Sequence, residues 1–82
     1  MIILATEDVN KEAILDLLDA NLSGYTVSST CGIWQGTREA SLFIYIVDAE
    51  PETIDGIIDR IKCMNDQDSI MVLTIPCGVE FK

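Results

Sequence analysis

Histidine is absent from this 82-residue sequence, and basic residues are scarce. Five lysines and arginines stand against fourteen aspartates and glutamates, which gives a formal charge of −9. Such an acidic chain repels the phosphates of nucleic acids and the surface of anionic membranes, so we expect neither as a direct partner. Without histidine, no cysteine or serine has the usual base, and no Walker, GxGxxG or GxSxG motif is present. The sequence therefore predicts no catalytic residues, no cofactor and no metal site, and a protein that is not an enzyme.

Long hydrophobic runs and paired cysteines are also missing. The uncharged apolar stretch at residues 69–79 is too short for a membrane-spanning helix. Cys31, Cys63 and Cys77 are odd in number and lack CxxC spacing, and the first residues lack the pattern of a secretory signal. We therefore expect a cytoplasmic protein with reduced thiols, in which each cysteine is a small buried apolar residue.

Enough apolar sequence is present for a hydrophobic core. Hydrophobic residues make up 49% of the chain, so the negative charge does not indicate disorder. No linker, repeat or low-complexity segment interrupts the sequence, and its length suits one domain. We predict a single domain over residues 1–82.

The spacing of apolar residues predicts two helices. The first starts after a short strand at residues 2–5, with Asp8 or Asn10 as its cap, and Ser23-Gly24 ends it because glycine adopts the left-handed conformation without strain. The second begins at Pro51, and its apolar positions follow the i, i+3, i+4, i+7 pattern of Ile54, Ile57, Ile58 and Ile61. Residues 64–68 are polar enough to form a loop.

Alternation and turn residues predict the remaining strands. Residues 25–34 alternate apolar and polar side chains, and a turn at residues 35–38 leads back into an uncharged strand at 41–47. Gly36 is free to take a positive φ in that turn. A further strand spans 70–75 and ends at Pro76, and Val79 and Phe81 suggest one more short strand.

This order predicts an α+β fold. Right-handed crossovers place both helices on one face of a four-stranded antiparallel sheet, which is the ferredoxin-like β-α-β-β-α-β plait, here followed by a short C-terminal strand. The other face of the sheet is then open, although its third and fourth strands are apolar there too. Exposed patches of that kind mark interaction surfaces, and self-association covers this one best. The predicted subunit interface consists of Trp34, Phe43, Tyr45, Val47, Met71 and Leu73.

Three features leave alternatives open. The ring of Trp34 either packs against a neighbouring subunit or folds back over its own sheet. Glu12, Asp16 and Asp19 share one face of the first helix, and Glu52, Asp55 and Asp59 share one face of the second. These carboxylates are either an ordinary solvated surface or a surface that attracts a basic partner. At the hairpin, Arg38 and Glu39 pair either with each other or across an interface.

The stretch IWQGTREASLFIYI, with Trp34, Gly36 and an apolar strand in that order, resembles the hairpin of the CutA family within the PII-like superfamily. DSIMVLTIP resembles the strand that follows the second helix there. The resemblance implies a trimeric ferredoxin-like protein that binds a ligand or protein partner in clefts between subunits. In this chain those clefts would involve the hairpin residues Trp34, Gln35, Gly36, Thr37, Arg38 and Glu39. This sequence lacks the phosphate-cradling loops of the signalling members and is shorter before Trp34, so nucleotide and copper binding are not implied.

We therefore predict a small regulatory or binding protein that forms a homotrimer and takes a small-molecule ligand or a protein partner near the hairpin. The alternative is a small acidic inhibitor, of the kind phages encode, that binds a basic partner such as a nucleic-acid enzyme. The carboxylate faces of the two helices are the evidence for that alternative.

Overall fold

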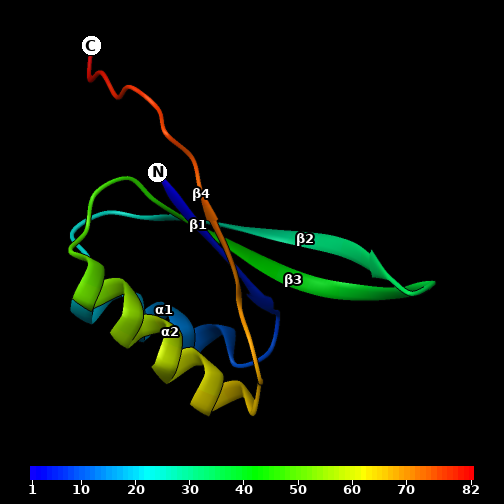
Figure 1. Ribbon diagram of the computed structural model, residues 1–82. Helices are drawn as coiled ribbons and strands as arrows, with labels where there is room; N and C mark the ends of the chain where they lie inside the picture. The colour runs from blue at the N-terminus through cyan, green and yellow to red at the C-terminus, as the bar shows by residue number, and fades with distance from the viewer.

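The computed structural model describes residues 1–82, except for the side chain of Trp34. The chain forms a small α+β unit with four strands and two helices, and Figure 1 shows their arrangement. In chain order the elements are β1 (Ile2–Glu7), α1 (Lys11–Asn21), β2 (Thr26–Trp34), β3 (Thr37–Ile46), α2 (Pro51–Asn65) and β4 (Met71–Thr74).

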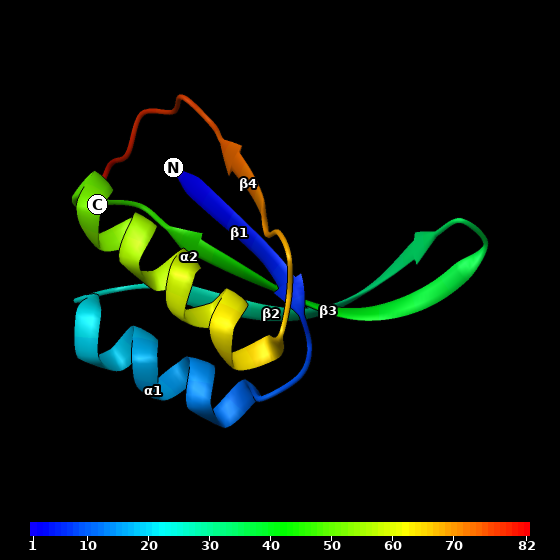
Figure 2. The ribbon, with the colours of Figure 1, turned by 60° about the horizontal axis from the view of Figure 1, so that its bottom comes forward.

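The four strands make one open antiparallel sheet in the order β2-β3-β1-β4. Strand β1 is central and pairs with β3 on one side and β4 on the other, while β2 pairs with β3 as a hairpin. Figure 2 shows both helices on the same side of the sheet. This arrangement is compatible with the expected ferredoxin-like fold.

The core lies between the helices and the sheet. Alternate residues of β1 and β3 point toward the helices, since Leu4 lies opposite Ile44 in the register. Both are fully buried, and the helical positions with the predicted periodicity meet them. The core cluster consists of Leu4, Ile14, Leu17, Leu18, Leu42, Ile44, Ile46, Ile54, Ile57 and Ile61.

The helix ends differ in part from the sequence expectation. Pro51 occupies the first turn of α2 as expected, but the helix continues through Asn65, and Asp66 closes it in the left-handed conformation with φ 50°. Asn10 precedes α1 without a side-chain cap; its Nδ2 instead donates to the Met64 carbonyl oxygen at 3.0 Å. Helix α1 ends at an extended Leu22, so the prediction of a left-handed glycine end there is wrong.

The hairpin turn is confirmed and is tighter than expected. Gln35 and Gly36 form a two-residue connection with φ values of 49° and 79°, and Trp34 pairs with Thr37. Both central residues have positive φ, as in the turn type that matches the twist of antiparallel strands. Strand β3 therefore starts at Thr37, earlier than the predicted residue 41.

The long hairpin extends past the helices (Figures 1 and 2). A ten-residue strand such as β3 spans about 34 Å, whereas the fifteen residues of α2 span about 22 Å. The helices therefore cannot cover the whole sheet, and the outer half of the hairpin has both faces exposed. The molecule is correspondingly elongated, with extents of 40 × 24 × 19 Å.

Residues 75–82 follow β4 without forming a helix or strand. The predicted short strand around Val79 and Phe81 is therefore wrong for the isolated chain. The start of this segment is held by the Ile75 amide, which donates to the Met1 carbonyl oxygen at 2.8 Å. Beyond it, the described residues supply no neighbouring strand for the segment to pair with.

Candidate functional site

The sheet face opposite the two helices, here called the open face, carries most of the predicted interface residues. The register places Ile3 beside Tyr45 on one side and Leu73 on the other, and Ala5 lies between Phe43 and Met71 in the same way. These six side chains therefore form one apolar surface across three strands. The β2 side of the open face is polar, with Thr26, Ser28 and Thr30.

Side chains of the open face pack against one another and are therefore partly buried. Ile3 is only 7% exposed, because Tyr45 and Leu73 lie on its two sides. Phe43 and Tyr45 are half-buried, their ring centroids are 6.4 Å apart, and the Tyr45 hydroxyl lies 3.1 Å from Ser28 Oγ. Met71 remains 52% exposed. The result is a second, shallow apolar cluster that lacks a cover.

Charge divides the two sides of the molecule. The six carboxylates noted on the helices are all exposed on the outer helical layer. The centre of the open face has none, and Glu7 and Glu39 lie only at its hairpin end. In the part of the chain that the structure describes, Glu80 and Lys82 form the single ion pair, at 3.0 Å. The open face is therefore the surface on which two copies of this acidic chain repel each other least.

The hairpin tip holds the residues predicted to bind a ligand. Gln35, Gly36, Thr37, Arg38 and Glu39 are all exposed there. The predictions for the Trp34 side chain lie outside the described residues. Arg38 and Glu39 are adjacent in β3 and so point to opposite faces, and the described contacts include no ion pair between them. Within one chain the tip is a projecting arm, and the predicted residues do not enclose a site.

A hollow of about 480 Å³, here called the hairpin hollow, lies where the hairpin joins the open face. Of the predicted ligand residues whose side chains the structure describes, Glu39 alone lines it. Its walls combine apolar side chains of the open face with hydroxyl, amide and carboxylate groups. They are formed by Ala5, Thr6, Glu7, Gly32, Ile33, Glu39, Ser41, Phe43, Gln67, Ser69 and Met71.

A hydrogen-bond network that the sequence reading missed supports one wall of the hairpin hollow. Thr6, only 3% exposed, donates through Oγ1 to Gln67 Oε1 at 2.8 Å. Asn65 Nδ2 donates to both of those oxygens at 3.2 Å, and Gln67 Nε2 donates to the Ser69 carbonyl oxygen at 2.9 Å. These bonds fix the segment between α2 and β4 against β1. The one available signal was Thr6 itself, a polar residue that directly follows the apolar residues 2–5 of β1.

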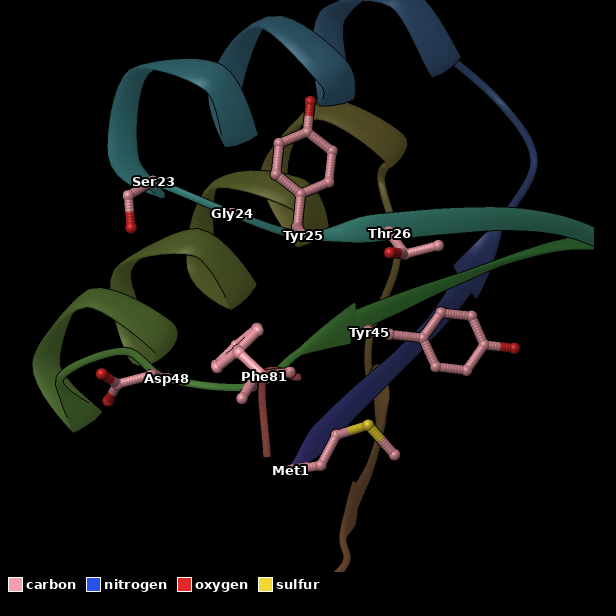
Figure 3. A pocket seen from close by; sticks show the side chains of 9 residues that line it. Met1, Ser23, Gly24, Tyr25, Thr26, Tyr45, Asp48 and Phe81 are labelled. Carbon is pink, nitrogen blue, oxygen red and sulfur yellow. The ribbon is translucent and has the colours of Figure 1, made fainter. Parts of the chain in front are cut away.

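A larger pocket of about 640 Å³, here called the tail pocket, lies at the other end of the sheet (Figure 3). It is lined by Tyr25 directly before β2, Tyr45 near the end of β3 and Phe81 from the final segment. Most of its surface is apolar, with Asp48 at the rim. The full lining is Met1, Ser23, Gly24, Tyr25, Thr26, Tyr45, Val47, Asp48 and Phe81.

Tyr25, beside the tail pocket, has a pKa that its neighbours shift. Its hydroxyl donates a hydrogen bond to Asp19 Oδ1. That bond, together with partial burial and the negative charges of Asp19 and Asp16, raises the pKa of Tyr25 above its usual value of 10.0. Tyr25 therefore stays protonated at physiological pH, and its hydrogen bond ties the residue before β2 to α1.

The three cysteines are all exposed, so the prediction that they are buried is wrong. Cys31 has the inward parity expected for it, but it lies on the part of the hairpin beyond the helices. Cys77 Sγ lies 3.8 Å from the amino group of Met1. No group of three potential metal ligands occurs among the described residues.

No family model matches this chain, and no curated protein is significantly similar to it. Within the described residues, neither helix is both long enough and apolar enough to cross a bilayer.

Proposed function

We propose that this chain is a PII-like ferredoxin-like plait that works by binding as a homotrimer, with a ligand or partner held between subunits near the hairpin. The observation that carries the proposal is the uncovered apolar cluster on the open face. A regulatory role of this kind needs an assembly and a cleft, and it does not need a catalytic residue.

The open face has the composition of a subunit interface. The centre of the open face is apolar, aromatic and free of charge, and polar residues border this centre along β2. Stable interfaces show the same arrangement, with charged residues depleted from the core and aromatic residues enriched. The helical layer has the opposite composition and would oppose close approach of a second copy.

The projecting hairpin supplies the second half of the contact. An isolated two-stranded hairpin is marginally stable in water, so its outer half gains from packing on another surface. The arm and the open face are different patches, and repeated contact between different patches closes into a ring when the rotation permits. A trimer built in this way brings the hairpin tip of one subunit, with its exposed residues 35–39, to the neighbouring sheet, where the hairpin hollow provides a cleft.

A charge placed on the open face tests the proposal. We expect Tyr45→Glu to dissociate the trimer, because burial of an unpaired carboxylate costs several kcal/mol. Ser29→Glu is the matched control, since Ser29 is exposed and has the opposite parity on the same sheet. Light scattering gives the mass of each variant, and circular dichroism reports whether it is folded. Equal dissociation of both variants, or of neither, would argue against the open face as the interface.

A second candidate function rests on the exposed carboxylates of the helices. The six side chains at positions 12, 16, 19, 52, 55 and 59 are all exposed and form no ion pair among the described contacts. An acidic inhibitor of a basic protein, such as a nucleic-acid enzyme, uses a surface of this kind.

Neutralising those six residues to Gln and Asn separates the two candidates. If they are a solvated layer, the variant keeps its assembly and becomes slightly more stable, because like charges at i, i+3 and i+4 repel. If they steer a basic partner, pull-down from lysate recovers a protein that only the acidic form retains and that added salt releases. We expect the stabilised variant and no such partner.

A further inference from the structure

The segment at residues 76–82 exposes two large apolar side chains to solvent. Val79 is 47% exposed and Phe81 is 93% exposed, and they alternate with Gly78 and Glu80. Outside the anchor at Ile75, no backbone hydrogen bond is found for this segment among the described residues. Its amides and carbonyls and its two large apolar side chains are therefore free to pair with another surface.

The tail pocket is a complementary surface. Its walls include Met1, Tyr25, Tyr45 and Val47, and Phe81 of the same chain also lines it but stays 93% exposed (Figure 3). The pocket volume of about 640 Å³ falls in the range of sites that enclose a sizeable apolar group. Val47, itself 51% exposed, would gain a cover if the pocket were filled.

We propose that the tail pocket of each subunit receives Phe81 from a second copy of the chain, with residues 76–82 lying along the neighbouring sheet. Charge favours this occupant. The chain as a whole carries −9, but residues 75–82 contain one acid and one base, and these form the ion pair at 3.0 Å. The neutral segment can therefore approach a second acidic chain with little repulsion.

Continuity with the open face also favours a second copy. Tyr45 belongs to the open face and to the tail pocket, and Val47 follows it at the end of β3. A subunit seated on the open face would therefore also border the tail pocket, within reach of its own segment 76–82. The inference deepens the proposed self-association and rests on it, but it concerns a separate contact that can fail by itself.

A mixed-label experiment locates the segment directly. Isotope-labelled and unlabelled full-length chains are unfolded, mixed and refolded, and intermolecular contacts are then measured by isotope-filtered NMR. We expect intermolecular contacts between the Phe81 ring and the Val47 methyl groups. Contacts that are only intramolecular, or no contact between these groups, would overturn the inference.

Variants measure the contribution of the contact. Phe81→Ser should raise the dissociation constant of the assembly by about ten- to a hundredfold, which corresponds to burial of one phenylalanine side chain. Val9→Ser removes another exposed apolar side chain, 44% exposed and outside the proposed interface, and should leave the constant unchanged. If Phe81→Ser leaves the dissociation constant unchanged while Tyr45→Glu still dissociates the trimer, Phe81 does not bind in the tail pocket of a second copy. The proposed function would then still stand. Loss of assembly in both variants and intact assembly in the Val9 control would support both proposals.

Discussion

Replacing Gly56 with alanine should stabilise the protein by about 1 kcal/mol. Gly56 lies in the interior of α2, where glycine costs about 0.8–1.0 kcal/mol relative to alanine because it loses more backbone entropy on folding. A Cβ built at this position meets no atom within 4 Å, and φ is not positive, so no clash or strain offsets the gain. For a domain of this size, 1 kcal/mol corresponds to a rise in Tm of about 4–8 °C.

Gly36→Ala is the matched control, because the same chemical change should there destabilise the protein. Gly36 has φ +79° in the hairpin turn, and a left-handed conformation costs an L-residue about 1–2 kcal/mol. Thermal unfolding is followed by circular dichroism at one fixed protein concentration, since association makes Tm depend on concentration. A lower Tm for Gly56→Ala would refute the reasoning. It would mean that the groove of about 200 Å³ beside Gly56, between α1 and α2, is filled in the assembled protein.

Two further predictions concern the polar ties of the fold. Thr6→Val should lower the free energy of unfolding by only about 1 kcal/mol, because Asn65 and Gln67 keep the hydrogen bond between them at 3.2 Å when the Thr6 hydroxyl is lost. Urea denaturation measures this difference. A loss several times larger would show that the hydrogen-bond network does not form without the Thr6 hydroxyl. Tyr25→Phe should be less stable than wild type at neutral pH, and the difference should disappear in alkali. The pKa of Tyr25 is higher in the folded protein than in the unfolded chain, where it is about 10. The contribution of the Tyr25 hydroxyl to stability is therefore complete below about pH 10 and is lost as the pH rises through the pKa of the folded protein. Unfolding curves of both proteins across that range test the sign, and a difference that grows with pH would contradict it.

Local sequence patterns predicted the elements whose structure depends on near neighbours. The isoleucines at positions 54, 57 and 61 of α2 are buried as their spacing requires, and Gly36 takes the positive φ expected of the hairpin turn. The uncharged strands likewise indicated a second apolar face. These predictions succeeded because helix periodicity, turn chemistry and strand alternation are set by adjacent residues.

Features that depend on tertiary distances were not predictable in the same way. Cys31 was expected to be buried because alternation along its strand places its side chain on the face toward the helices. Alternation cannot show that the hairpin extends beyond the ends of the helices, where Cys31 is exposed. The Thr6 network joins residues about sixty positions apart in the sequence, and the spacing gives no sign of it. The tail pocket was missed for the same reason, since it joins residue 1 to residue 81.

The alternation at Val79 and Phe81 shows a third kind of limit. Its period of two predicts a strand, yet the single chain offers residues 76–82 no edge with which to pair. A strand needs a partner, and the pattern does not say which chain supplies it. The mixed-label experiment on Phe81 therefore also tests whether this sequence signal belongs to the assembled protein.

The mass of the protein in solution tests the central claim most directly. Light scattering at micromolar concentration should give about three times the 9.0 kDa mass of the chain, and Tyr45→Glu should reduce it to one chain that remains folded. A wild-type protein that stays at 9.0 kDa across the concentration range, with its open face accessible to an apolar dye, would contradict the account.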